Sequence, residues 1–321
     1  MGEHRDEAKN SNTYLNKEQK ECIVELHKKG KEISRLRNRP LVLMFYSKEV
    51  GGSIDEDDLY ELENKLDERI PLGVEELDVI IQTTGGDANT SYLLAQLLRE
   101  YCSYMETLIP NYAYSGGTLI SLASDKIILG KTARISPIDL QLSYGGSEKI
   151  SPFALVDIEK YIDFINDSCD KFQFQSEENK TAFITPLVKE LVGEHGTKKL
   201  GELFRMRGLT EFHARILLMD YMLKNFSNRK ERATHIIKRL TSESPTHDFE
   251  IDYNIAKKVL GLSVEQMEGN LYKLTRHLIS MCDKAKGLGL ICSFTSSKDR
   301  KPYFEVFLPN AETEEKNEQT K

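Results

Sequence analysis

Two glycine-containing segments hold the residues best suited to chemistry, a serine hydroxyl and unobstructed backbone N–H groups. Ser115 precedes Gly116-Gly117 in "YAYSGGTLIS", and Gly85-Gly86 stands in "QTTGGDAN". A serine beside two sets of backbone donors suits acyl transfer, because the tetrahedral intermediate concentrates negative charge on one oxygen. Each segment alone is more typical of a structural turn, with glycine at the tight bend and serine as a helix N-cap. Their occurrence together favours the chemical interpretation.

An alternation of buried-strand runs and amphipathic helices surrounds both segments. Strands and helices at this spacing predict right-handed βαβ units and a mainly parallel sheet. Both glycine turns would then lie at the carboxyl edge of that sheet, where ligands bind, with Ser115 at a helix N-terminus whose partial positive charge favours an alkoxide. The expected strands are 41–46, 77–82, 106–110, 126–129 and 133–138, and the expected helices are 59–66, 88–101 and 118–123.

Two longer stretches carry a family resemblance. Residues 78–98, "DVIIQTTGGDANTSYLLAQLL", and 109–142, which contain "YSGGT" and "SPIDLQ", resemble the Clp/crotonase superfold, and within it the serine dehydrogenase proteinase family related to signal peptide peptidase A. A weaker match at 246–262 resembles the segment that closes the family's domain, so the resemblance covers about 41 to 262. The positions that match in order and spacing are Thr83, Gly85-Gly86, Ser115 to Thr118, Asp125, Pro137 to Asp139 and Gln141.

The resemblance and the patterns together predict the domain organisation. The resemblance implies an α/β fold, a Clp/crotonase-like spiral of ββα units with a mainly parallel sheet. The patterns add a helical C-terminal part and a small terminal hairpin, with strands over 288–295 and 303–308. The expected parts are an N-terminal polar segment and amphipathic helix at 1–38, the peptidase-like domain at 39–262, a helix and hairpin at 263–308, and a charged tail at 309–321.

The resemblance also implies roles for particular residues. Ser115 would be the nucleophile, and the Gly86 and Gly116 backbone amides would form the oxyanion hole. A serine hydroxyl is a poor nucleophile at neutral pH without a base. The sequence therefore has to provide a basic group elsewhere in the chain.

The identity of that base stays open. The Clp peptidases supply a histidine after the serine, but residues 138–141 contain none. Signal peptide peptidases use a lysine kept neutral by burial, and Lys149 in "GGSEKISPF" occupies a comparable place. A solvated loop lysine explains Lys149 equally well. Lys160, beside Glu159 within a helix, is better explained as a surface residue, and His247 as a structural one.

Three positions depart from the family pattern. Tyr114 stands where a small residue is usual before the serine, and we expect it to narrow the cleft. Ser136 and Leu140 replace the usual glycine and second proline around Pro137. In addition, most relatives with the signal-peptidase name carry a membrane anchor, and this sequence shows none.

Composition excludes several other classes. A formal net charge of −7 argues against a nucleic-acid groove. No apolar run approaches the length of a membrane span, and the first residues lack the apolar core of a signal peptide. The odd number of scattered cysteines predicts free thiols in the cytoplasm, with no structural metal and no cofactor.

We therefore expect a serine endopeptidase with a Ser-Lys or otherwise atypical dyad, acting on peptides or proteins as a homo-oligomer. Two alternatives remain. A crotonase-like acyl-thioester enzyme would use the same two amides without a serine nucleophile, and the Ser115 hydroxyl favours the peptidase over it. A catalytically silent scaffold, in which Ser115 only caps a helix, would explain the missing histidine.

Overall fold

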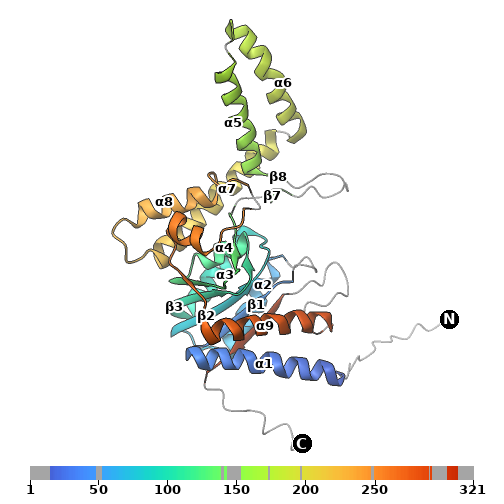
Figure 1. Ribbon diagram of the computed structural model, residues 1–321, viewed down its shortest axis with the longest axis vertical. Helices are drawn as coiled ribbons and strands as arrows, with labels where there is room; N and C mark the ends of the chain where they lie inside the picture. The colour runs from blue at the N-terminus through green and yellow to red at the C-terminus, as the bar shows by residue number, and fades with distance from the viewer. Residues whose placement is uncertain are drawn as a thin grey trace, which may run out of the picture.

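The centre of the computed structural model is one six-stranded sheet, and all of its neighbouring strands are parallel except the first pair (Figure 1). This confirms the predicted α/β class with a mainly parallel sheet. In spatial order the strands are β10 (Tyr303–Phe307), β1 (Leu41–Phe45), β2 (Val74–Gln82), β3 (Cys102–Ile109), β5 (Lys126–Leu129) and β9 (Val264–Gln266). The structure describes residues 15–47, 53–138, 141–142, 153–172, 174–195, 197–246, 249–288, 290 and 302–309.

Helices cover both faces of the sheet, so its inner strands are buried on both sides. In β1, Val42 and Met44 belong to one hydrophobic core, whereas Leu41, Leu43 and Phe45 belong to the other. This double burial explains why the strands read as continuous apolar runs. The first core is covered by α2 (Asp57–Arg69), α3 (Ala88–Glu100) and α4 (Gly116–Ser121), and the second by α1 (Lys17–Arg37) and α9 (Gly269–Gly287).

A second, much shorter layer of β-structure follows the carboxyl ends of the long strands. β4 (Tyr112–Ala113) pairs in parallel with β6 (Arg134–Ile135). Isolated bridges extend this layer through Thr83–Ala113, Ile54–Gly86 and Ile135–Ile251. β1, β2 and β3 are therefore each followed by a short extended segment before the next helix, which is the ββα repeat expected of a Clp/crotonase-like spiral.

The described residues from 155 to 260 are mainly helical, which agrees with the predicted helical C-terminal part. The pair α5 (Leu155–Lys171) and α6 (Glu177–His195) projects away from the sheet (Figure 1). The other helices return toward the first core, where Leu217, Met222 and Ile236 are buried. They are α7 (Thr197–Leu217), the π-helix η1 (Leu218–Met222), α8 (Arg229–Leu240) and the π-helix η2 (Ile255–Leu260).

The structure describes only one of the two strands of the predicted terminal hairpin. Its second strand exists as β10, which pairs with β1 in antiparallel fashion. Most of the first strand, 288–295, lies outside the described residues, so the hairpin remains a prediction, as do the domain boundaries. β9 and β10 both come from residues after 262, and they form the two edges of the central sheet.

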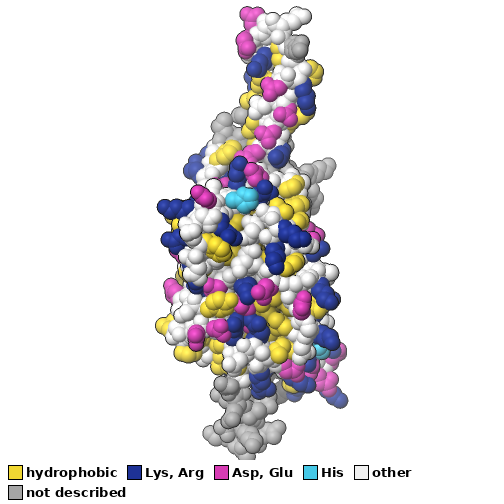
Figure 2. Space-filling model, turned by 60° about the vertical axis from the view of Figure 1, so that its left-hand side comes forward, with side chains coloured by type: hydrophobic (Ala, Val, Ile, Leu, Met, Phe, Trp, Pro, Cys, Tyr) yellow, Lys and Arg dark blue, Asp and Glu magenta, His cyan; other side chains and the backbone are white. Residues whose placement is uncertain are grey.

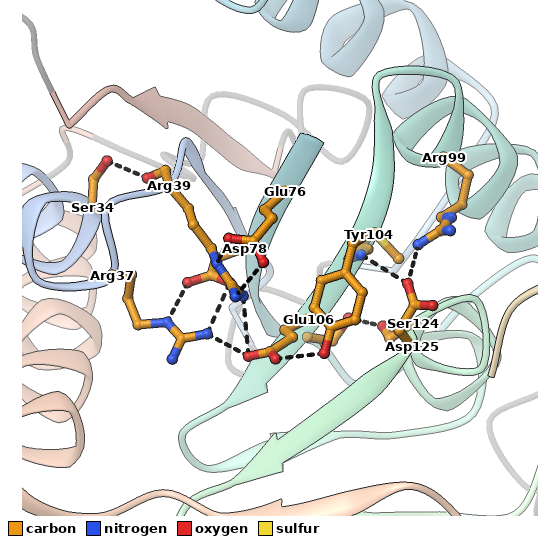
Figure 3. Close-up of polar contacts among 12 residues, drawn as sticks. Ser34, Arg37, Arg39, Glu76, Asp78, Arg99, Tyr104, Glu106, Ser124 and Asp125 are labelled. Carbon is orange, nitrogen blue, oxygen red and sulfur yellow. Dashed lines mark hydrogen bonds and ion pairs between the residues drawn. The ribbon is translucent and has the colours of Figure 1, made fainter. Parts of the chain in front are cut away.

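A cluster of buried charges ties the end of α1 to the middle of β2 and β3 (Figure 3). The Arg37 Nε atom lies 2.7 Å from Asp78 Oδ2, and the same guanidinium also contacts Glu106. Arg39 adds contacts of 3.2 Å to Asp78 and 3.3 Å to Glu106. Burial raises the pKa of Asp78 even though both arginines oppose the shift. The ion pairs therefore offset the cost of placing two carboxylates under a helix.

Replacing Arg37 by alanine should lower the free energy of unfolding by about 3 kcal/mol, because it leaves buried carboxylates with one arginine fewer. Arg35, exposed in the same helical turn, is the matched control, and Arg35→Ala should change stability by less than about 0.5 kcal/mol. Urea unfolding followed by circular dichroism measures both. Equal losses in the two variants would contradict a stabilising role for the cluster.

Candidate active site

Ser115 occupies a strained backbone position between β4 and α4. Its φ of 47° and ψ of −109° place a non-glycine residue in a region that L-residues rarely adopt. Its carbonyl accepts a hydrogen bond from Leu119 N–H at 3.0 Å, so the backbone starts the helix. Its side chain makes no capping hydrogen bond. The sharp turn thus directs the half-buried hydroxyl away from the role of a helix cap.

Two other hydroxyl groups hold this turn in place. The Ser115 N–H donates to Ser136 Oγ at 2.8 Å. Thr118 Oγ1 donates to the Ala113 carbonyl at 2.9 Å and accepts from Ser136 N–H at 3.1 Å. Ser136 is the residue that replaces the family's usual glycine, so this departure from the pattern was the available signal for a contact that sequence reasoning did not anticipate.

The turn after β2 lies directly against the Ser115 turn. A methyl group placed on Gly85 would lie 2.7 Å from Ser115 Cβ and 3.1 Å from Gly116 N. A methyl group on Gly116 would lie 3.3 Å from Gly86 N. Gly85 and Gly86 have φ values of 105° and 155°, which side-chain-bearing residues rarely adopt. The two glycine turns therefore meet at the carboxyl edge of β2 and β3.

Two N–H groups at this meeting point have no acceptor in the part of the chain that the structure describes. The Gly85 N–H donates to Thr83 Oγ1 at 3.0 Å, and the Gly117 N–H donates to the Tyr114 carbonyl at 2.8 Å. By contrast, neither the Gly86 nor the Gly116 N–H has a hydrogen-bond acceptor within the described part of the chain. Backbone donors left free in this way can bind an anionic oxygen.

Of the three basic residues considered from the sequence, the structure describes only Lys160. Lys149 and His247 lie outside the described residues. Lys160 lies on the exposed side of α5, 3.8 Å from Asp163, which agrees with its interpretation as a surface residue. Sequence reasoning did not single out His213. Its ring stacks on Tyr92 of α3 at 4.0 Å, and its Nδ1 atom is buried without a described hydrogen-bond partner.

Burial also decides the charge state of His213. The desolvation of the ring lowers its pKa, and the Asp87 carboxylate opposes this shift. The imidazole is therefore neutral at neutral pH and available to accept a proton. It packs against α3, the helix that the Gly86 turn opens.

Tyr114 is anchored beside the serine. Its ring stacks on Tyr112 at 5.2 Å, and its hydroxyl donates to Glu250 Oε1 at 2.9 Å. Burial, followed by this hydrogen bond, raises the pKa of Tyr114 to about 12. The side chain is thus a neutral donor fixed next to Ser115, and the predicted narrowing of a cleft stays a prediction.

The described residues provide neither a cluster of metal ligands nor a membrane-spanning helix. They contain no group of three or more histidine, cysteine, aspartate or glutamate side chains arranged to hold a metal ion. No helix among them is both long enough and apolar enough to cross a membrane.

The ββα spiral and the serine-bearing turn at its sheet edge define a Clp-like α/β protein. Residues 14–202, more than half of the chain, match the family described as ClpP-like SDH-type serine proteinase. The chain belongs to this family, as its motifs predicted.

Similar proteins do not extend this assignment to an activity. Two uncharacterized proteins of Methanocaldococcus jannaschii, MJ1495 and MJ0137, are 30% and 27% identical over 56% and 59% of this chain. The matches cover 61% and 53% of those proteins, so the chain spans less than two thirds of their length. A mutant ClpP1 from Listeria monocytogenes matches 77% of this chain and 98% of its own, at 14% identity and a TM-score of 0.39.

Gly86→Ala should destabilise the fold more than Gly73→Ala. A methyl group on Gly86 would lie 2.2 Å from Ile54 N, whereas one on Gly73, at a φ of 80°, would meet nothing within 4 Å. Gly73→Ala therefore tests backbone strain alone, at about 1–2 kcal/mol, and the clash at Gly86 should add about 1–3 kcal/mol. Denaturant melts give both values, and equal losses would mean that the Gly86 turn has room to move.

Proposed function

We propose that this protein is a serine endopeptidase that hydrolyses peptide bonds through an acyl-enzyme on Ser115. One observation carries the proposal: the Gly86 and Gly116 backbone nitrogens lie close together beside Ser115, and their N–H groups are unpaired among the described residues. Membership of a serine proteinase family supports it. The substrate would be a peptide or protein segment that presents its scissile carbonyl to these two donors.

The chemistry follows from the arrangement. Ser115 Oγ attacks the carbonyl carbon while a base removes its proton, and the carbonyl oxygen becomes an oxyanion that accepts hydrogen bonds from Gly86 and Gly116. The C–N bond then breaks, and the base returns the proton to the leaving amine. A water molecule then attacks the ester carbon while the base takes its proton. The C–Oγ bond breaks, the base returns the proton to Ser115 Oγ, and the acid is released.

The strained conformation of Ser115 suits this role. A serine on a sharp turn keeps its hydroxyl clear of the helix that follows. The Ser136 and Thr118 contacts hold the turn before substrate arrives, so little reorganisation is needed in the transition state. Residues in unfavourable backbone regions are concentrated at active sites for this reason.

For the base we propose Lys149, in a Ser-Lys dyad. A lysine becomes a general base when burial lowers its pKa enough to keep the amine neutral. His213, which is neutral and buried, is the alternative within the described residues.

We also propose that the protein works as a homo-oligomer. Four exposed phenylalanines lie on α5, directly after α5 and on α7. Figure 2 shows hydrophobic side chains along the projecting part of the molecule. Large exposed apolar patches mark protein–protein interaction sites. The four phenylalanines are Phe164, Phe172, Phe204 and Phe212.

Ser115→Ala should abolish peptide hydrolysis and labelling by a fluorophosphonate probe, yet leave the melting temperature nearly unchanged, because the side chain caps no helix. Ser103→Ala, an exposed serine on β3, is the matched control and should label normally. Unchanged labelling of Ser115→Ala would contradict the nucleophile assignment. If the wild-type protein binds coenzyme A but is not labelled, it is the acyl-thioester enzyme. If it is neither labelled nor binds coenzyme A, it is the silent scaffold.

Lys149→Ala should lower kcat by about 10²–10⁴-fold, the usual contribution of a general base. Lys160→Ala is the control and should retain wild-type turnover, since Lys160 is exposed on α5. Steady-state kinetics on a fluorogenic peptide measure both. Normal turnover by Lys149→Ala would exclude Lys149 as the general base without affecting the assignment of Ser115 as the nucleophile. His213→Ala would then be the variant to measure.

A further inference from the structure

The backbone of Ile54 is hydrogen-bonded to the Gly85-Gly86 turn on both sides of Gly86. Ile54 N–H donates to the Gly85 carbonyl at 2.9 Å, and Asp87 N–H donates to the Ile54 carbonyl at 2.9 Å. Gly86 lies between these two bonds as the partner of Ile54 in an isolated parallel bridge. Both peptide units that flank Gly86 are therefore held by one residue from another part of the chain.

The hydrogen bond from Ile54 to the Gly85 carbonyl fixes the direction of the Gly86 N–H. The Gly85 carbonyl and the Gly86 N–H belong to the same peptide unit, which is planar and trans, so they point in opposite directions. While Ile54 holds the carbonyl, the N–H must point away from Ile54. Rotation of that peptide would break the bond to Ile54 and turn a carbonyl oxygen toward the oxyanion position.

Asp58 holds the peptide unit between Ile54 and Asp55 by a hydrogen bond. Asp55 N–H donates to Asp58 Oδ2 at 2.9 Å, and this N–H shares its peptide unit with the Ile54 carbonyl that Asp87 uses. The same Oδ2 atom accepts the Tyr46 hydroxyl at 2.9 Å. Asp58 is only 2% exposed, in the first turn of α2. Its carboxylate thus orients the peptide unit on which the glycine turn rests.

The surroundings make a buried carboxylate costly at this position. Burial raises the pKa of Asp58 to about 7, the acidic Asp55 and Glu61 add to the shift, and the Asp55 N–H and the Tyr46 hydroxyl oppose it. Within the described residues no lysine or arginine forms an ion pair with Asp58. The contacts that oppose this cost are the two hydrogen bonds that Asp58 Oδ2 accepts from the Asp55 N–H and the Tyr46 hydroxyl.

We propose that Asp58 is a positioning residue for the oxyanion hole: through Asp55 and Ile54 it holds the peptide whose Gly86 N–H faces the substrate carbonyl. This inference rests on the proposed peptidase function. Asp58 touches no substrate, and its effect should reach the reaction only through the orientation of Gly86.

The kinetic test compares three variants. Asp58→Ala removes the acceptor and should lower kcat by about 10- to 100-fold with little change in KM, less than the 10²–10³-fold loss of a whole oxyanion donor. Asp58→Asn keeps an acceptor oxygen and should restore kcat to within about threefold. Tyr46→Phe removes the other donor to the same Oδ2 atom and should keep wild-type kcat.

A second measurement does not depend on activity. Amide hydrogen exchange of Asp55 and Asp87 should be at least about tenfold faster in Asp58→Ala than in Tyr46→Phe, because each lost hydrogen bond exposes its N–H. Wild-type exchange rates at both amides in Asp58→Ala would overturn the proposal, as would a kcat equal to that of Tyr46→Phe. If the wild type shows no Ser115-dependent hydrolysis, the peptidase proposal fails, and the exchange data alone decide whether Asp58 positions the turn.

Discussion

Three backbone segments meet within van der Waals contact at Gly86. A Cβ atom on Gly86 would lie 2.2 Å from Ile54 N, which is too close for any side chain. A Cβ atom on Gly85 would likewise lie 2.7 Å from Ser115 Cβ. Side chains at these positions would separate the segments. The absence of side chains at Gly85 and Gly86 is therefore the constraint on which the arrangement of the site depends, because only then can N–H groups from two strand–helix turns face one point.

The sheet supplies the rigidity that this close approach needs. β1, β2 and β3 are parallel and in register, so the segments that follow them leave the sheet at the same edge. Helices bury both faces, and the Arg37 and Arg39 guanidinium groups neutralise carboxylates in the middle of β2 and β3. Buried charges within these strands are thus paired, whereas two backbone donors beyond their carboxyl ends have no partner among the described residues.

Hydrogen bonding around Ser115 follows the same division. Neighbouring N–H groups donate to Thr83, Tyr114 and Ser136, whereas those of Gly86 and Gly116 have no acceptor among the residues that the structure describes. Unpaired donors beside a strained serine are what an acyl-transfer site requires. In a purely structural turn the same donors would be expected to find partners, since unmade hydrogen bonds cost free energy once water is excluded.

The sequence by itself determined the family, the mainly parallel sheet and the place of the two glycine turns, because these depend on local patterns: apolar runs, turn residues and motif spacing. It identified Ser115, Gly86 and Gly116 as candidates for the same reason. Only the tertiary structure decided that Ile54 and Asp58 support the Gly86 turn and that Ser136 binds the Ser115 N–H. It also decided that His213 is buried against α3 and that β10 joins β1. These contacts join residues from different elements, and no local pattern encodes which distant hydroxyl, carboxylate or strand edge will complete a given backbone group.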